Sequence, residues 1–336
     1  MYRRLVDLSD RWWRLSNLYV IRDKERRRVK LRLNPAQERI RNAIAPVLAA
    51  GKPIRHKDLK ARQVGDTTFW SLMYLDDAIF NPNTLGCIVA QKYDTLGFIW
   101  ETVRLAHQLM PSALQPRLAQ DNTRALSFAD ISSRISVSLK VEGTALHDLH
   151  VSEYALCDPD DIEKSLAACA PNANITFETV SEGMNHAYDK WIDSEDSYTR
   201  CFHPWFIMPE YRSTAPLTRP RTEEETAFAS MAYSRHGITI DAYQIAFRRE
   251  KQREHRRLFK SLFAEDEDTC FLASGGSFFD ASKIRVLLRE AKDSLAKSPP
   301  FLDGPEKKVW EKPLHRHIYV GGVDGAGGNY NVGSDP

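Results

Sequence analysis

Apolar and polar residues near the N-terminus follow two different periodicities, one typical of strands and one typical of a helix. Residues 19–34 read YVIRDKERRRVKLRLN, an alternation around a charged turn that predicts a β-hairpin. A helix begins at Asn34, because Ile40, Ile44 and Leu48 recur at the spacing of one helical face. The chain is therefore expected to open with a hairpin and an amphipathic helix.

Strand-like and helical patterns alternate farther along the chain. A helix is expected from Thr67, and another from about Tyr93 to Leu109. The segments with a strand pattern are LGCIVA (85–90), ALSFA (125–129), RISVSLKV (134–141), LHDLHVSE (146–153) and NITFETVSEG (174–183). This alternation predicts an α/β fold, with a mostly parallel sheet flanked by helices and catalytic loops at the carboxyl ends of the strands.

The chain changes character after residue 208, where a polar, proline-containing stretch suggests a domain boundary. Residues 1–208 are expected to form the α/β core. Residues 209–300 are expected to form a helical subdomain and linker, largely helical over 223–264. Residues 301–336 read as a linker followed by the start of a new strand.

Composition narrows the class of protein. The 336 residues are 42% hydrophobic and 27% charged, as in soluble globular proteins, and 47 basic against 45 acidic residues give a net charge of +2. This balance excludes a general affinity for nucleic acid, so any DNA contact must come from a local patch. No apolar run approaches the roughly 20 residues of a membrane helix. The five cysteines lack metal-ligand spacing and are expected to be reduced thiols.

The stretch LKARQVGDTTFW contains an altered phosphate-binding loop. In the G-x-x-x-x-G-K-[ST] pattern, backbone N–H groups and a lysine hold phosphates while a hydroxyl binds Mg²⁺. Aligned on Gly65 and Thr67, this stretch has Lys60 at the first position and Asp66 in the place of the lysine. Lys60 and, inside the loop, Arg62 are the candidate phosphate donors. The alternative is a solvated basic turn before a helix.

Asp66 is the main difficulty of this interpretation. A carboxylate about 4 Å from a phosphate charge would cost roughly 4 kcal/mol at an effective dielectric constant of about 20. Nucleotide binding is therefore compatible with Asp66 only if its side chain points out of the loop. We expect this carboxylate to face bulk solvent.

Other segments carry candidate chemistry, each with a simpler alternative. Glu153 fits the carboxylate that activates water and Ser152 the neighbouring Mg²⁺ position, although a strand can also end in a solvated glutamate. Thr179 begins a small polar loop that either senses the γ-phosphate or is a plain strand-to-helix turn. Upstream, Gln37 is a candidate for reading the adenine edge with Tyr19 beside the base, or else an exposed helix residue.

These segments, in this order, resemble the large terminase subunit of tailed phages, the motor that packages DNA into capsids. RWWRLSNLYVIRD with RLNPAQ is similar to the adenine-side motif of that family, and LKARQVGDTT to its variant Walker A loop. LHVSEYA is similar to its Walker B segment and FETVSEGMNHAY to its coupling motif. FHPWF, HGITIDAYQIAFRR and CFLASGGSFFD follow in family order, so the resemblance extends from about Trp12 to Asp335.

The resemblance implies a P-loop NTPase of the ASCE type, with a mostly parallel sheet flanked by helices and a helical lid, which hydrolyses ATP with Mg²⁺. By this resemblance Glu153 is the catalytic carboxylate, Arg62 and Thr179 act with it, and Thr67 and Ser152 hold Mg²⁺. The residues implied in nucleotide binding are Lys60, Arg62, Gln63, Gly65, Thr67, Thr68, Gln37 and Tyr19.

The resemblance also identifies family features that this chain lacks. YVGGVDGAGGNYNVGSD resembles the opening of the family's RNase H-type nuclease domain, where Asp324 matches the first metal-binding aspartate. The chain ends before the remaining carboxylates of a two-metal site, so no nuclease activity is expected. Glu142 stands where the family often has arginine, so a sensor arginine is expected to be missing.

The partners implied by the resemblance are double-stranded DNA, bound without sequence preference, a portal protein, a small terminase subunit and further copies of the chain in a ring on the procapsid. The implied location is the cytoplasm of a bacterial host. Residues 245–260, IAFRREKQREHRRLFK, carry many basic side chains over about four helical turns. This helix either follows the DNA backbone or is a solvated helix paired through Glu250 and Glu254.

Two other classes of function remain open. A decayed prophage protein would keep the fold, bind nucleotide weakly or not at all, and have no catalytic activity. A different P-loop motor, such as a helicase, is disfavoured by the aromatic segments and by FHPWF. Binding of Mg-ATP separates the enzyme from the prophage remnant.

Overall fold

The computed structural model describes residues 7–272, 302–303 and 308–309. The chain divides into two compact units, residues 1–276 and 277–336. In the second unit, β11 (Leu302–Asp303) pairs antiparallel with β12 (Lys308–Val309). Asp324, expected as a nuclease ligand, lies outside the described residues. The domain boundaries expected from the sequence stay predictions.

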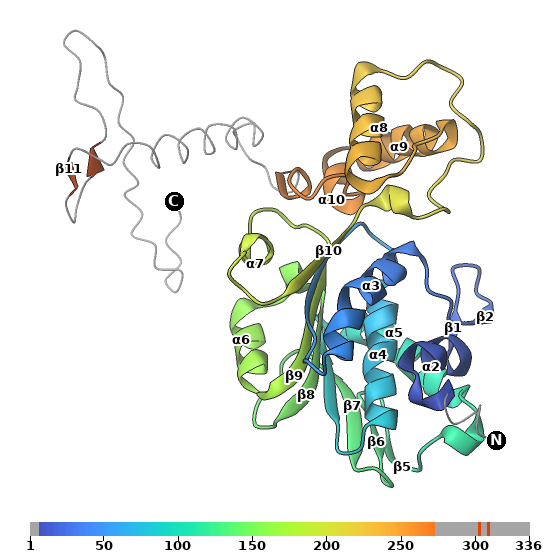
Figure 1. Cartoon of the computed structure of the whole chain (residues 1–336), viewed down its shortest axis with the longest axis vertical. Coiled ribbons are helices and arrows are strands. Elements are labelled where there is room, and N and C mark those ends of the chain that lie inside the picture. Colours follow the sequence, from blue (N-terminus) through green and yellow to red (C-terminus); the bar gives the residue numbers. More distant parts are fainter. Residues whose placement is uncertain (1–6, 273–301, 304–307, 310–336) are drawn as a thin grey trace. The chain divides into compact units, whose positions relative to one another are not determined.

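The first unit is built on a large mixed sheet, which has eight strands within the described residues, in the order β10-β3-β9-β8-β4-β7-β6-β5 (Figure 1). Neighbouring strands from β10 to β7 are parallel, and β6 and β5 continue the sheet antiparallel. The strands are β3 (Arg55–Lys60), β4 (Leu85–Val89), β5 (Leu118–Asp121), β6 (Ala125–Phe128), β7 (Ser133–Ser138), β8 (Leu146–Ser152), β9 (Cys169–Thr179) and β10 (Thr199–His203). The predicted mostly parallel α/β sheet is confirmed.

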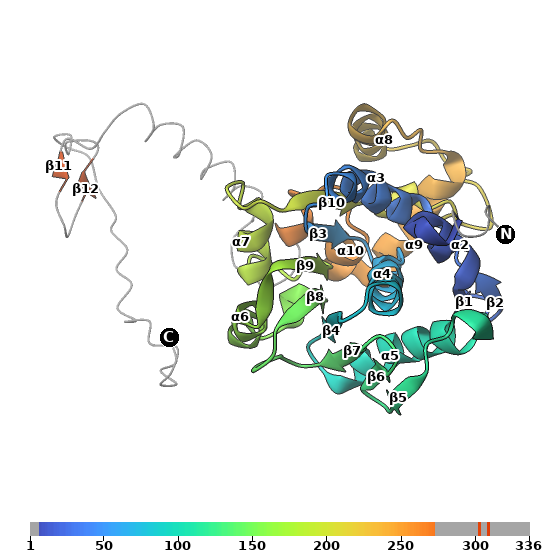
Figure 2. The same ribbon diagram turned by 60° about the horizontal axis from the view of Figure 1, so that its bottom comes forward.

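Helices cover both faces of this sheet (Figure 2). One layer holds α2 (Arg11–Leu18), α3 (Pro35–Ala49), α4 (Asp66–Phe80) and α5 (Tyr93–Gln108), and the other holds α6 (Pro159–Ala167) and α7 (His186–Ile192). The fully buried side chains of Trp70 and Tyr74 fill the core beneath α4. None of the helices in the described part of the chain has the length and apolarity that crossing a membrane requires.

Strand β9 is inserted between β3 and β8. In the register of these strands Glu178 of β9 lies opposite Asp58 of β3 on one side and Ser152 of β8 on the other. All three strands are parallel, so their carboxyl ends meet at one edge of the sheet. The ends of β3, β8 and β9 therefore bring residues that are far apart in the sequence to the same place.

Local predictions near the N-terminus are confirmed. β1 (Val20–Arg22) and β2 (Arg28–Lys30) form the expected antiparallel hairpin. α3 begins where expected because Asn34 and Gln37 form a capping box, in which each side chain accepts from the other residue's backbone N–H.

The strand patterns in the sequence gave no indication of β5 or β10. β10 is the more important omission because it pairs with β3.

The chain after β10 forms a helical subdomain, drawn from yellow to orange in Figure 1. It contains α8 (Glu223–His236), α9 (Ala242–His255) and α10 (Phe259–Leu262). Its core is rich in buried aromatic residues, which include Trp205, Phe206, Phe228, Phe247 and Phe263. We refer to residues 204–272 as the lid subdomain, because Tyr211 and Leu262 of this segment contact the loop between β3 and α4.

We expect Asp76 to be a major source of stability for the packing of α2 against α4. Its buried carboxylate accepts from Arg14 Nη2 at 2.6 Å and from the Tyr19 hydroxyl at 2.9 Å. Asp76→Ala leaves the Arg14 guanidinium buried without its counter-charge, so the free energy of unfolding should fall by about 3–5 kcal/mol in urea titrations.

The matched control is Asp121→Ala, which removes the partner of Arg104 in an ion pair whose side chains are 37% and 34% exposed. That loss should stay below about 1 kcal/mol. Equal losses for the two variants would contradict the assignment.

Candidate functional site

The segment between β3 and α4 has the backbone of an anion-binding loop. β3 ends at Lys60 and α4 begins at Asp66. Within the loop Gln63 and Gly65 have left-handed backbone conformations, with φ of 58° and 93°. Such turns direct successive backbone N–H groups into a common concavity, and the N-terminus of α4 adds its partial positive charge. The loop is therefore preorganised to hold phosphate oxygens.

The phosphate loop is held from one side by the start of α3. Asn34 Nδ2 donates to the carbonyl of Val64 at 2.8 Å, and Gln37 Nε2 donates to the carbonyl of Gly65 at 2.8 Å. Gln37 is thus not an exposed helix residue, and it does not point to an adenine, because its buried amide accepts from Asn34 N and donates to the carbonyl of Gly65. Tyr19 was also wrongly placed beside the base: it is fully buried and its hydroxyl donates to Asp76.

The lid subdomain holds the phosphate loop from the other side. Arg62 N donates to the carbonyl of Leu262, and the Tyr211 hydroxyl donates to the carbonyl of Arg62, at 2.8 and 2.6 Å. Ala61 N donates to the carbonyl of His203 at 2.8 Å, at the end of β10. A displacement of the lid subdomain must therefore either break these hydrogen bonds or move the backbone of the loop with it.

A hollow of about 600 Å³ lies over the loop. It is lined by Lys24, Lys60, Arg62, Gln63, Gly65, Thr67, Thr68 and Glu153. The structure thus brings together the lysine, loop, hydroxyl and glutamate that the sequence suggested for one site. A second hollow of about 650 Å³ lies between residues 213–219 and α9, but no phosphate loop contributes to it.

Lys60 lies at the centre of a buried ionic network. Its ammonium is 3.0 Å from Glu153 Oε1 and 2.9 Å from Glu178 Oε2, and only 5% of its side chain is exposed. Burial alone would lower the pKa of Lys60, but the carboxylates of Glu153 and Glu178 raise it above its ordinary value. Lys60 is therefore a fixed positive charge at the mouth of the phosphate loop.

Glu178 is the functional residue that the sequence reasoning missed. Its Oε1 accepts from the hydroxyls of Thr67 and Ser152, both at 2.6 Å, and its side chain is fully buried. Burial would raise the pKa of Glu178, but Lys60 and His150 hold it well below its ordinary value, so the group is a carboxylate. The available signal was the charge itself, because Glu178 is the one charged residue in the segment ITFETV, which has a strand pattern.

The two strand ends beside Lys60 are joined by hydrogen bonds. Glu153 has a left-handed backbone with φ of 53°, and its Oε2 accepts from Val180 N at 3.4 Å. Thr179 Oγ1 accepts from Ala155 N at 3.0 Å and donates to the carbonyl of Val180. Thr179 thus connects the segment after Glu153 to the end of β9, while the side chain of Glu153 remains 26% exposed to the hollow.

The expectation that Asp66 faces bulk solvent was wrong. Its side chain is fully buried, and Asp66 Oδ2 lies 2.7 Å from His203 Nδ1. Burial alone would lower the pKa of His203, but Asp66 raises it to about 10, so the imidazole is positively charged. The negative charge of Asp66 is thus neutralised below the loop, and Asp66 is not among the residues that line the hollow.

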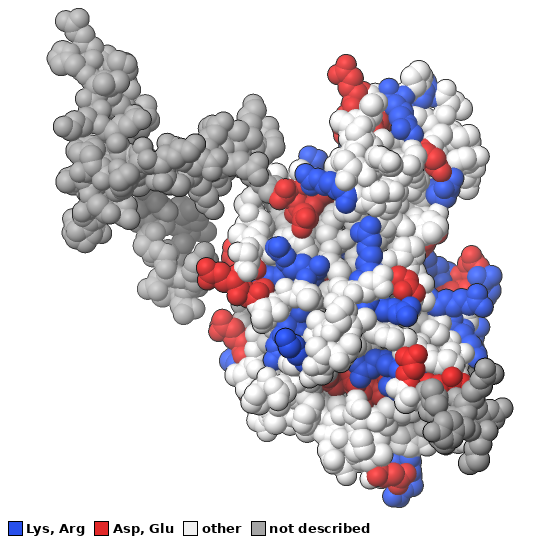
Figure 3. All heavy atoms as spheres, in the orientation of Figure 1, with Lys and Arg blue, Asp and Glu red and all other residues white. Residues whose placement is uncertain are grey.

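The basic stretch predicted to contact DNA is largely paired within the protein. Arg248 is buried between Glu224 and Glu265, and Arg249 pairs with Glu225. Lys251 pairs with Glu254. A solvated helix in which Glu254 forms an ion pair was the alternative interpretation of this stretch. The exposed cations of the stretch are Arg253, Arg256, Arg257 and Lys260. Figure 3 shows basic and acidic side chains interspersed over the face that it draws.

Gly65 should not tolerate a side chain. Its φ of 93° is strained for other residues, and an added Cβ would lie 3.0 Å from both Asn34 Nδ2 and Gln37 Nε2. Gly65→Ala should therefore lower the free energy of unfolding by about 1–3 kcal/mol. Gly97→Ala, inside α5 with no atom within 4 Å of the new Cβ, should instead raise it by about 0.5–1 kcal/mol. Denaturant titration of both variants checks this, and an undiminished stability of Gly65→Ala would refute the described loop.

The fold is similar to that of phage large terminases. The HK97 bacteriophage large terminase has a TM-score of 0.53 and 14% sequence identity, over 75% of this chain and 53% of that chain. This chain therefore spans about half the length of the HK97 protein. The Thermus phage P74-26 large terminase ATPase domain has a TM-score of 0.40 and 13% identity, over 70% of this chain and 99% of that one.

A large terminase from a thermophilic bacteriophage, in complex with ADP, has a TM-score of 0.37 and 16% identity, over 46% of this chain and 41% of that one. No family model and no curated protein sequence matches the chain. The similarity therefore concerns the three-dimensional structure. With its phosphate loop on a mostly parallel sheet, the chain has the α/β fold of the phage large terminase.

Proposed function

We propose that the protein is an ATP hydrolase of the DNA-packaging type, a large terminase subunit. The observation that carries this proposal is the position of the Lys60 ammonium between Glu153 and Glu178, at the mouth of the phosphate loop. A nucleoside triphosphatase needs a cation for the phosphates and a carboxylate for the attacking water in one hollow. Lys60 and Glu153 both line this hollow.

The phosphate chain is proposed to bind along the loop between Lys60 and Thr68. Backbone N–H groups of the loop donate to the phosphate oxygens, and Lys60 supplies the charge that usually comes from a lysine before the hydroxyl residue. Arg62 and Gln63 are exposed on the rim of the hollow and are available to contact the nucleotide. The inward ion pair of Asp66 removes the repulsion that its sequence position suggested.

Glu178 is proposed to take the Mg²⁺ role that the resemblance gave to Ser152. Thr67, Ser152 and Glu178 offer oxygen atoms, the ligand type that Mg²⁺ prefers, and both hydroxyls already donate to Glu178. Mg²⁺ bound there would neutralise charge that develops on the phosphates. The carboxylate is supplied from β9 instead of β8, because the neighbouring strand brings it to the same edge of the sheet.

Glu153 is proposed to orient and polarise the water that attacks the γ-phosphate. It is the partly exposed member of the pair of carboxylates around Lys60, so it can reach a water in the hollow. When the ammonium turns to a phosphate, Glu153 is released from Lys60 and becomes free to accept a proton from water. Thr179, bonded to the segment after Glu153, is placed to transmit this change to β9.

The motor partners belong to the same proposal. Double-stranded DNA, a portal protein, a small subunit and a ring of identical chains follow from membership of the terminase class, and the host cytoplasm is the place of action. On the chain itself, the exposed cations of residues 253–260 support a contact with a DNA backbone. The alternative of a non-catalytic prophage remnant is distinguished from the enzyme by the first experiment below.

Mg-ATP binding and hydrolysis test the proposal directly. Calorimetry should detect Mg-ATP binding to the wild-type chain and to Glu153→Gln, because the amide keeps the shape of the side chain. Steady-state hydrolysis by Glu153→Gln should fall about 10²–10⁴-fold. Glu142→Gln, which changes an exposed glutamate outside the hollow, is the control and should hydrolyse like the wild type. Absence of binding by the wild type would support the remnant and end the enzyme proposal.

The dependence of hydrolysis on Mg²⁺ concentration tests whether Glu178 or Ser152 is the more important residue for binding Mg²⁺. Glu178→Gln should raise the Mg²⁺ concentration for half-maximal hydrolysis about 10–100-fold, because the carboxylate beside the ion is lost. Ser152→Ala should change it by less than about tenfold, because only a hydroxyl that donates to Glu178 is removed. Circular dichroism verifies that both variants fold. The reverse order of effects would return the Mg²⁺ role to Ser152.

A further inference from the structure

The strand that leads into the phosphate loop carries an unusual number of buried polar side chains. β3 reads RHKDLK, and every residue after Arg55 is buried. Polar groups in such a position need partners, because burial without them is costly. His56 and Asp58 project to the same face of the sheet, since side chains alternate along a strand. This face lies toward α4, where Trp70 donates to Asp58 at 2.7 Å.

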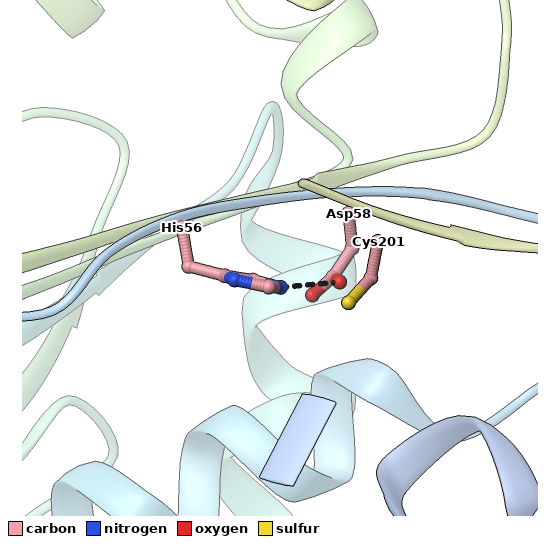
Figure 4. A group of neighbouring side chains, drawn as sticks. All are labelled: His56, Asp58 and Cys201. Atoms are coloured by element: carbon pink, nitrogen blue, oxygen red, sulfur yellow. Dashed lines mark hydrogen bonds and ion pairs between the residues drawn. The ribbon is translucent and has the colours of Figure 1, made fainter. Parts of the chain in front are cut away.

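Strand β10 places matching side chains beside them. In the parallel register Thr199 pairs with His56, Cys201 with Asp58, and His203 with Lys60. Figure 4 shows His56, Asp58 and Cys201 converging beneath the sheet, with the helices on the far side of the group. An imidazole, a carboxylate and a thiol from two strands, separated by more than a hundred residues in sequence, therefore meet in the core.

The distances within this group suit a metal ion. One donor atom from each of His56, Asp58 and Cys201 lies within 4.8 Å of the others, and the same holds for Asp58, Asp66 and His203. Ligand atoms in a tetrahedral zinc site are about 3–4 Å apart, because the bonds are about 2.0–2.3 Å long.

The atoms that point away from the group are already oriented by other residues. His56 Nδ1 is 2.6 Å from the Thr199 hydroxyl, which leaves its Nε2 to face Asp58 Oδ1 at 2.7 Å. His203 Nδ1 is 2.7 Å from Asp66. A carboxylate or hydroxyl on the outer nitrogen of each imidazole is the usual support of a metal-bound histidine. The Thr199 contact therefore leaves His56 Nε2 facing Asp58, where a metal ion would replace the proton of the hydrogen bond between the two residues.

The neighbouring pair of Asp66 and His203 is incompletely satisfied. Within the described part of the chain, His203 Nε2 and Asp66 Oδ1 are buried without a hydrogen-bond partner, and the side chains of both residues are fully buried.

We propose that His56, Asp58 and Cys201 bind one transition-metal ion, Zn²⁺, beneath the phosphate loop. A thiolate and an imidazole with a single carboxylate are ligands for zinc, whereas Mg²⁺ and Ca²⁺ are held by oxygen atoms. Cys201 is partly exposed and provides the route of entry. This site is separate from the proposed nucleotide site and does not depend on its function.

The metal would fasten β10 to β3 directly below the loop. His203 is adjacent to the nucleotide site through its backbone, because its carbonyl accepts from Ala61 N. It also leads directly into the lid subdomain, which begins at the next residue. A metal bound by Cys201 of β10 and by His56 and Asp58 of β3 would fix the relative positions of the loop and the base of the lid subdomain.

Metal analysis of the purified full chain tests this site. Protein prepared without chelators should contain about one zinc ion per chain by elemental mass spectrometry. Cys201→Ser and His56→Gln should lower the zinc content at least tenfold. Cys169→Ser, which changes a partly exposed free cysteine outside the group, should keep it. Stripping zinc from the wild type with a strong chelator should lower Tm by about 10 °C.

Cobalt substitution provides a readout if a variant fails to fold. Co²⁺ added to chelator-treated wild-type protein should give the absorption bands of tetrahedral thiolate ligation, and Cys169→Ser should give the same bands. A wild-type chain that is free of metal, indifferent to the chelator and without a Co²⁺ spectrum would overturn the proposal. So would a Cys201→Ser variant that folds and retains zinc.

Discussion

The buried ammonium of Lys60 is the charge around which the candidate site is organised. A cation that is taken out of water is tolerated only when its surroundings repay the lost hydration, and Glu153 and Glu178 do so within 3.0 Å. This requirement draws the ends of β3, β8 and β9 together. It also explains why a charged side chain, Glu178, is fully buried in β9, since removing it would leave the partly exposed Glu153 as the nearest counter-charge of Lys60.

A second constraint concerns the backbone of the phosphate loop. The loop is hydrogen-bonded to the start of α3 through Asn34 and Gln37, and to the lid subdomain through Leu262 and Tyr211. These contacts fix the left-handed turns that present N–H groups to an anion. Because the loop bridges two parts of the same compact unit, a ligand that reshapes it has a direct mechanical route to the lid subdomain.

The sequence predicted those parts of the fold that depend on local patterns. The hairpin near the N-terminus, the capped α3 and the strands that end at Ser152 and Thr179 arise from alternation, capping and apolar runs, all of which are short-range signals. The roles of Glu178, Asp66 and His203 could not be predicted in this way. Their partners lie tens to more than a hundred residues away, and the polar strand β3 and the edge strand β10 resemble solvated segments until the sheet is assembled.

The central claim is that Lys60 exchanges a carboxylate for a nucleotide phosphate. A crystal structure with Mg²⁺ and a non-hydrolysable ATP analogue measures this most directly. The account predicts phosphates along the loop, with Lys60 Nζ within hydrogen-bond distance of a β- or γ-phosphate oxygen and no longer bonded to Glu153. Phosphates bound elsewhere, or an empty hollow with Lys60 still between Glu153 and Glu178, would contradict it.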